Sequence, residues 1–157
     1  MSDLDTTLAA SLAGRFTACV NRICELAAPL NNTQFWTKPL PYGNSFGHLV
    51  LHLTGNLNYY IGAQIAATGY VRDRPREFAE STPPSKEETL KGLSNAVAMV
   101  VETIHAQAST DWMKDYSAVG TDCNNRLDMT LRCAAHMHHH IGQMIYLVAE
   151  LQRQAGS

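Results

Sequence analysis

The sequence predicts an all-α protein that folds as a four-helix bundle. In four long segments, apolar residues recur at three- and four-residue steps, the spacing of a helix with one buried face. Proline, glycine and asparagine gather between these segments, and strand-like alternation is weak along the whole chain. Four helices that each have one apolar face bury those faces most simply against one another, as a bundle.

The first two helices are predicted over residues 4–30 and from Asn44 or Ser45 to about residue 68. Either residue is a good N-cap, because its side-chain oxygen can accept a hydrogen bond from a backbone N–H of the first turn. The stretch between the two helices breaks the pattern with Pro29, Pro39, Pro41 and Gly43. The apolar stripes consist of Leu8, Leu12, Phe16, Cys19 and Ile23, then of Phe46, Leu49, Leu53, Leu57 and Tyr60.

The third and fourth helices are predicted over residues 85–107 and 126–154. Ser85 precedes Glu88 by three residues, an arrangement that resembles a capping box at a helix N-terminus. The connection before this helix has about 15 residues, which is longer than the usual turns of antiparallel bundles, so we expect a crossover. The loop at residues 109–125 is expected to hold at most a short extended piece.

Composition indicates one globular domain over residues 1–157, with 45% hydrophobic and 17% charged residues and a net charge of −2. No nucleic-acid partner is expected, because the chain lacks a basic stripe and the segment RDRPREF (72–78) also holds two acidic residues. The sequence has neither a signal peptide nor a run of ~20 apolar residues, so we expect a cytoplasmic protein without a membrane partner. The four cysteines lack metal-ligand spacing and are expected to be reduced thiols.

The densest histidines lie in the segment HMHHH, residues 136–140. Because a helix advances about 100° per residue, His140 lies about 40° from His136, on the same side of the fourth helix. Both face the apolar sector, whereas His138 and His139, at about 200° and 300°, face away from it. The apolar sector consists of Met129, Cys133, Met144, Leu147 and Leu151. Two inward imidazoles at positions i and i+4 can bind one divalent transition metal, or they can be core histidines hydrogen-bonded to neighbouring helices.

A second HxxxH pair, His48 and His52, lies in the second helix. The helical phase places His52 at the border of the apolar stripe and His48 further out, so His52 is the better candidate for a third ligand. Inward side chains on facing helices are the usual source of metal sites in bundles. Three histidines would leave a coordination position open, as catalytic sites do, and they suit zinc or nickel best.

Three segments, SFGHLVLHLTGNLNYYI, RDRPREF and HMHHHIGQM, together resemble the DinB-like superfamily of metal-binding four-helix bundles. The most specific element is H-x3-H-x-G-Q, formed by His136, His140, Gly142 and Gln143. The resemblance implies an up-down-down-up bundle, frequent homodimers, and three metal ligands: His52, His136 and His140. One departure is Ile141, where the family commonly has arginine, and it affects no ligand.

The resemblance also implies a chemistry, since members include thiol-dependent S-transferases and a thiol-dependent maleylpyruvate isomerase. We therefore expect a metal-dependent enzyme that acts on a small-molecule substrate with a low-molecular-weight thiol. Two alternatives remain, a non-catalytic metal-binding, stress-associated dimer and a hydrolase in which metal-bound hydroxide attacks the substrate. The hydrolase is disfavoured, because no acidic residue lies near the ligand turns of these two helices and Asp128 faces away.

Several further residues have both a functional and a structural interpretation. Cys133 shares the inward face and is either a fourth ligand or, more commonly for cysteine, a small core residue. His48 is a less favoured candidate ligand that otherwise supports a ligand or is exposed, and Gln143 is expected to contact a ligand or a neighbouring helix. Asn56 and Asn58 either orient a substrate or a ligand, or occupy solvated or polar positions of the bundle. Three loop aromatics are expected to cover one end of the bundle, as a lid or as packing anchors: Trp36, Trp112 and Tyr116.

Overall fold

A computed structural model of the chain describes residues 2–79, 82–118 and 122–156. Within these ranges the protein is all-helical, as predicted, and no strand is present. The four long helices and a π-helical turn are α1 (Asp3–Ala27), α3 (Phe46–Leu57), η1 (Asn58–Ala63), α5 (Lys86–His105) and α7 (Arg126–Ala155). The short helices are α2 (Asn32–Trp36), α4 (Arg76–Ala79) and α6 (Ser109–Trp112).

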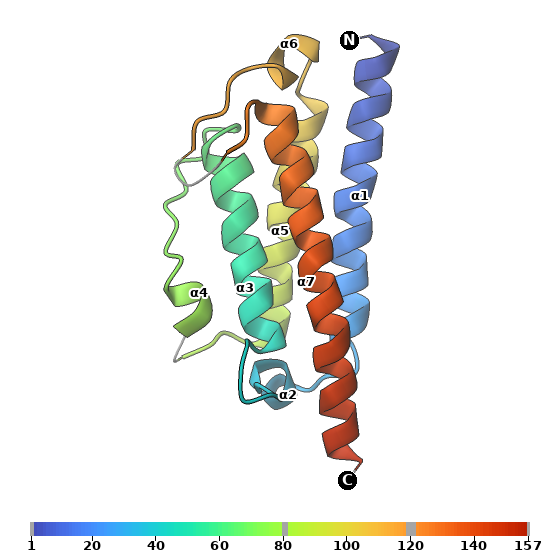
Figure 1. The fold of residues 1–157 in the computed structure, drawn as a ribbon, viewed down its shortest axis with the longest axis vertical. Helices are drawn as coiled ribbons and strands as arrows, with labels where there is room; N and C mark the ends of the chain where they lie inside the picture. Colours follow the sequence, from blue (N-terminus) through green and yellow to red (C-terminus); the bar gives the residue numbers. More distant parts are fainter. Residues whose placement is uncertain (1, 80–81, 119–121, 157) are drawn as a thin grey trace.

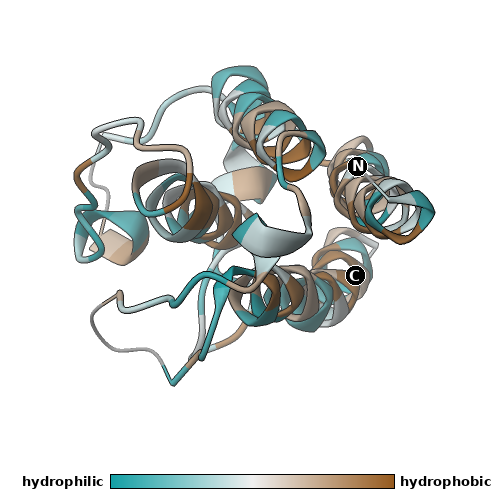
Figure 2. Cartoon of the chain, turned by 90° about the horizontal axis from the view of Figure 1, so that it is seen from above, coloured by the Kyte–Doolittle hydropathy of each residue, from teal (hydrophilic) through white to brown (hydrophobic). Residues whose placement is uncertain are grey.

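The long helices pack side by side around one hydrophobic core. Helix α1 packs against α5 and α7, and α3 packs against the same two helices from the other side. In Figure 1 the chain descends through α1, ascends through both α3 and α5, and descends again through α7. Figure 2 shows the same helices from above, with hydrophobic residues mainly on the sides that face one another. No helix of the described residues is long and apolar enough to cross a membrane.

The predicted helix boundaries hold at three positions and fail at two. The N-caps at Ser45 and Ser85 and the start of α7 at Arg126 agree with the prediction, and Ser85 and Glu88 form the predicted capping box. Helix α1 ends at Ala27 rather than at Leu30, next to a proline that cannot continue the backbone hydrogen bonds. Lys86 stabilises this end by donating from Nζ to two backbone carbonyls, those of residues 27 and 30.

The second difference is at the end of α3, which stops at Leu57 and continues as the π-helical turn η1. The sequence analysis instead predicts a regular helix to about residue 68. π-Helical turns occur most often inside α-helices at functional sites, and periodicity does not reveal them. Asp115 and Asn125 form an isolated antiparallel bridge, which is the short extended piece expected in the 109–125 loop.

The three loop aromatics cover both ends of the bundle, not one as predicted. Trp36 closes α2 at the lower end in Figure 1, where its Nε1 donates to the carbonyl of Pro84 over 3.1 Å. Trp112 is buried in α6 at the opposite end, and Tyr116 donates its hydroxyl proton to the carbonyl of Tyr60 over 2.8 Å. These contacts make Trp36 and Tyr116 packing anchors, because both hold a connecting segment against a helix end.

Candidate metal centre

Three histidine side chains from two helices converge at mid-height of the bundle. His52 on α3 faces His136 and His140, which lie one turn apart on α7. The Nε2 atom of His136 is 2.9 Å from Nε2 of His52 and 3.2 Å from Nε2 of His140. One ligand atom from each ring lies within 4.8 Å of the other two, so the group could hold a metal ion.

Hydrogen bonds on the far side of two rings determine which nitrogen is left for a metal. Nδ1 of His52 lies 2.8 Å from Oε2 of Glu77, and Nδ1 of His140 lies 2.7 Å from Oε1 of Gln143. Both oxygens are acceptors, so each Nδ1 carries the proton and each Nε2 presents a lone pair to the centre of the group. His136 can donate an Nε2 proton to one of these lone pairs, which leaves the other unsatisfied. A shared cation satisfies all three nitrogens at once.

The spacing of the nitrogens also suits a metal. Two nitrogens bound at ~2.0–2.1 Å to one tetrahedral ion lie about 3.3 Å apart. The measured separations of 2.9 and 3.2 Å are slightly shorter, so small side-chain rotations would admit the ion. Three imidazoles leave a fourth coordination position for a water molecule or a substrate. The residues present therefore fit a divalent transition metal.

Behind His52 lies a buried ion pair that the sequence analysis did not predict. Arg72 binds the Glu77 carboxylate through two nitrogens, with Nε 2.7 Å from Oε1 and Nη2 2.8 Å from Oε2. The side chains of His52, Glu77 and Arg72 are each less than a tenth exposed. A carboxylate that holds the distal N–H of a ligating histidine fixes the ring's orientation and increases its basicity. The long connection between α3 and α5 thus supplies the support for the histidine on α3.

A glycine on α3 gives Glu77 the space to approach. A Cβ atom at Gly55 would collide with the Glu77 carboxylate. Because Gly55 lies one turn after His52, the bare backbone there lets the carboxylate reach the imidazole of the preceding turn. The segment that contains Glu77 has no helical periodicity, and the close pairing of Gly55 with Glu77 cannot be read from either residue separately.

Electrostatics keep His136 and His140 neutral and the Glu77 carboxylate charged. Burial, together with the neighbouring histidines, lowers the pKa of His136 to about 3 and that of His140 to about 4. Both rings are therefore neutral at pH 7, the form in which imidazole binds a metal. Burial by itself would raise the pKa of Glu77, but hydrogen bonds from His52 and Arg72 hold this pKa below its ordinary value.

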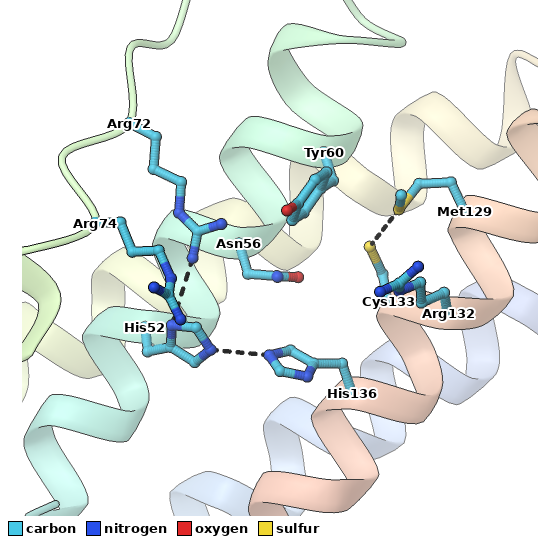
Figure 3. A pocket seen from close by; sticks show the side chains of 9 residues that line it. All are labelled: His52, Asn56, Tyr60, Arg72, Arg74, Met129, Arg132, Cys133 and His136. Atoms are coloured by element: carbon cyan, nitrogen blue, oxygen red, sulfur yellow. Dashed lines mark hydrogen bonds between the residues drawn. The ribbon is translucent and has the colours of Figure 1, made fainter. Parts of the chain in front are cut away.

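A pocket of about 170 Å³ opens beside the histidines (Figure 3). In Figure 3 His52 and His136 lie at its lower end, Tyr60 and Met129 at its upper end, and Asn56 points across it from α3. The nine lining residues include three arginines and no carboxylate: His52, Asn56, Tyr60, Arg72, Arg74, Met129, Arg132, Cys133 and His136. A small molecule in this pocket would lie next to the histidine nitrogens.

Comparison with known proteins identifies the family. Residues 15–144, most of the chain, match the sequence profile of the DinB superfamily. The chain belongs to the DinB superfamily. Its fold resembles a crystal structure described as a conserved protein from Enterococcus faecalis, with a TM-score of 0.74 over 90% of this chain and 95% of that chain. The two share 17% sequence identity, so this likeness concerns the fold alone. None of the curated proteins matches the sequence significantly.

The candidate ligands of this DinB-superfamily chain come together as expected, and the remaining histidines of the cluster do not join them. His138 and His139 are exposed on α7, as the helical phase predicts. His48 differs from its expected position further out, because it is buried, 8% exposed. Its Nδ1 lies 2.6 Å from the Ser45 hydroxyl, and its ring packs edge-on against Trp36 at the start of α3. The described residues that form the metal-compatible group do not include His48.

The other predicted candidates have more specific surroundings than the sequence indicates. Cys133 is buried with its Sγ 3.6 Å from the Met129 sulfur, and burial raises the pKa of its thiol to about 12. Such a thiol is protonated at pH 7 in the metal-free protein, and the metal-compatible group among the described residues does not include Cys133. Gln143 contacts a candidate ligand, His140, which was one of its two interpretations. Asn56, for which both a substrate- or ligand-orienting role and a solvated or bundle-polar position are open, is buried and lines the pocket. All four cysteines are free thiols.

Proposed function

We propose that His52, His136 and His140 bind one divalent transition metal and that the protein is a metal-dependent enzyme acting on small molecules. The observation that carries this proposal is the convergence of three Nε2 atoms beside a pocket that two of the three histidines, His52 and His136, line. A closed structural site would have four protein ligands, whereas three histidines beside a pocket leave a position for a reactant.

The proposed reaction is the transfer of a low-molecular-weight thiol to an electrophilic substrate. A divalent ion in this site would lower the pKa of a coordinated thiol and so supply a thiolate nucleophile at neutral pH. Glu77 would hold the His52 ring in its ligating orientation, and Gln143 would do the same for His140. No carboxylate is among the pocket-lining residues, which disfavours a hydrolysis in which a carboxylate base assists the attacking water.

Finer features of the proposal follow from the donor set and the family. Neutral imidazoles without a carboxylate ligand suit zinc or nickel. We also propose one domain with up-down-down-up topology, supported by the helix directions and the long connection between α3 and α5, and a homodimer as in other family members. Light scattering coupled to gel filtration measures the oligomeric state directly, and a monomer mass would contradict the dimer.

The test of the metal site is the metal content of purified protein by elemental analysis. The proposal expects about one zinc or nickel ion per chain after loading, and loss of this ion in His136→Ala and His140→Ala. Exposed His105 on α5 provides the matched control, and His105→Ala should retain the ion. Unchanged metal content in the first two variants would contradict the ligand assignment.

The test of the reaction is a conjugation assay with a panel of small thiols and a chromogenic electrophile such as 1-chloro-2,4-dinitrobenzene. Loss of turnover on chelation, with recovery on adding zinc or nickel, would support a metal-dependent S-transferase. Turnover that is unaffected by the chelator would contradict it. Metal binding without turnover of any thiol would instead support the non-catalytic alternative.

A further inference from the structure

The pocket beside the histidines is lined by arginine side chains that are not part of the candidate metal site. Arg72, Arg74 and Arg132 line it, and none of its lining residues is acidic. Arg72 is committed, because its guanidinium is bound by Glu77 through two nitrogens and lies 5.6 Å from the Tyr60 ring centre. The other two arginines are therefore the ones available to a ligand.

Arg74 and Arg132 reach the pocket from opposite sides. Arg74 is exposed, and its guanidinium carbon lies 5.7 Å from the ring centre of Phe78. Among the carboxylates in the described ranges, none forms an ion pair with Arg74. Arg132 contacts Asp122, but the Asp122 side chain is 91% exposed, so this pair is weak and readily exchanged. Two guanidinium groups without a strong partner are suited to bind an oxyanion.

Asn56 provides an independent sign of a ligand. Its side chain points across the pocket in Figure 3, and the residue is only 7% exposed. Its Oδ1 atom is buried and has no hydrogen-bond partner among the described residues. An unsatisfied buried carbonyl costs free energy, and such atoms in native proteins usually have a role. A hydrogen-bond donor of a bound molecule would satisfy it.

The helix geometry places these groups on the same side of the histidines. Asn56 lies four residues after His52 on ascending α3, and Arg132 lies four residues before His136 on descending α7 (Figure 1). Because four residues make about one helical turn, both side chains lie one turn above the candidate ligands. A molecule that reaches the histidine nitrogens from the pocket must therefore pass Asn56 and Arg132.

We propose that this pocket binds a small molecule that carries an oxyanion, held by Arg74 and Arg132, and a hydrogen-bond donor that faces Asn56 Oδ1. The inference deepens the proposed function and rests on the same pocket, since it names the chemical class of the thiol or substrate. Carboxylates with a neighbouring hydroxyl or amine have the required combination of groups.

The test is isothermal titration calorimetry of the full chain, both metal-free and zinc-loaded, with three small thiols of matched length. The probes are 3-mercaptopropionate, its neutral analogue 3-mercaptopropan-1-ol, and 3-mercaptolactate, which adds one hydroxyl to the acid. We expect the acid to bind roughly 10-fold more tightly than the alcohol, and 3-mercaptolactate to bind more tightly still. Arg74→Gln combined with Arg132→Gln should bring the acid-to-alcohol ratio close to 1, whereas exposed Arg15→Gln on α1 should not change it.

A second set of titrations tests the role of Asn56. Asn56→Leu, which keeps the branching at Cγ and removes the polar atoms, should remove the advantage of 3-mercaptolactate over 3-mercaptopropionate and preserve the preference for acid over alcohol. Asn56→Ser is the second variant if leucine disturbs the fold, and exposed Asn95→Leu is the matched control. Equal affinity of the wild-type protein for acid and alcohol would overturn the inference, as would ratios that none of these variants changes. The titrations of metal-free protein test the oxyanion site even if zinc does not bind. A failure of zinc to bind would contradict the proposed function but not the oxyanion site.

Discussion

The molecule has two HxxxH pairs, and only one of them contributes both members to the candidate metal centre. On α7, His136 and His140 direct their Nε2 atoms to the same point. On α3, His52 joins them, while His48 binds Ser45 and packs against Trp36 near the lower end of the bundle. Equal spacing therefore does not give equal function. The two pairs differ in where their side chains point: both histidines of the α7 pair face α3, whereas only His52 of the α3 pair faces α7.

The comparison also shows how each histidine is supported. His140 is oriented from its own helix, by Gln143 three residues on, so the support is encoded locally. His52 is oriented from outside its helix, by Glu77 of α4. The absence of a side chain at Gly55 leaves space for the Glu77 carboxylate, and Arg72 forms an ion pair with it. Helix α7 carries His140 together with its support, whereas His52 on α3 depends on the long connection that follows that helix.

The largest effect expected from this comparison is on zinc affinity when a histidine of either pair is removed. His140→Ala should weaken zinc binding at least roughly 100-fold, because it removes a coordinating nitrogen. His48→Ala should change zinc affinity less than about twofold, although it removes a buried contact and lowers the melting temperature. Competition with a chromogenic chelator measures both affinities. A large loss of zinc affinity in His48→Ala would show that both pairs contribute to the site.

The next effect concerns the external support of His52. Glu77→Gln removes the carboxylate charge from both His52 and the buried guanidinium of Arg72, and should lower zinc affinity roughly 10- to 100-fold. The same chelator competition measures it, with circular dichroism as the control for folding. If Glu77→Gln binds zinc as tightly as the wild-type protein does, the ion pair behind His52 serves the fold and not the metal site.

Gly55→Ala tests the same support without changing a charged group. The added Cβ would push the Glu77 carboxylate away from His52, so we expect zinc affinity to fall about 10-fold. Gly92→Ala on α5 is the matched control, because a Cβ there meets no neighbouring atom and alanine favours the helix. Wild-type zinc affinity in both variants would contradict the proposed support of His52 by Glu77.

The pH dependence of stability provides a smaller but sharp contrast. In the metal-free folded protein the pKa of His136 is about 3 and that of His140 about 4, below the value of 6.5 for an exposed histidine. As the pH falls below 6.5, the unfolded chain binds protons at both residues and the folded chain does not, so stability is lost. The melting temperature of metal-free protein should therefore fall between pH 7 and pH 4.5, and less steeply in His136→Gln. Identical slopes in the two proteins would contradict the neutral, buried state of His136.

The smallest effect is expected at the exposed members of the histidine cluster. His138→Ala should leave zinc affinity within about twofold of wild type, because its ring faces away from the ligands. His139→Ala should weaken binding only slightly, since His139 contacts the Gln143 amide and packs edge-on against the His140 ring but offers no nitrogen to the metal-compatible group. Affinity losses equal to that of His140→Ala would mean that the outward histidines are ligands.

Much of this site could be predicted from the sequence because it lies on regular helices. Helical phase separates His136 and His140 from their exposed neighbours and selects His52 over His48. The same phase argument placed His48 too far out, because it does not include Trp36, which α2 brings over that end of α3. An element outside the periodic segments can bury a residue that its own helix would expose.

What the sequence could not provide depends on contacts between distant segments. Glu77 lies 25 positions after His52 in a connection without periodicity, so no spacing rule links the two residues. The π-helical turn after α3 depends on local backbone choices that apolar periodicity does not distinguish from a regular helix. From the sequence, the arginines of the pocket are indistinguishable from ordinary surface charges, because only the fold brings them close to Asn56.

The central claim is that three histidines from two helices, supported in two different ways, form one metal site. Anomalous diffraction from crystals of zinc-loaded protein, measured at the zinc absorption edge, tests it most directly. The account predicts one strong peak between the Nε2 atoms of His52, His136 and His140. A peak at His48, a peak at the exposed His138 and His139, or no peak at the predicted position would contradict it.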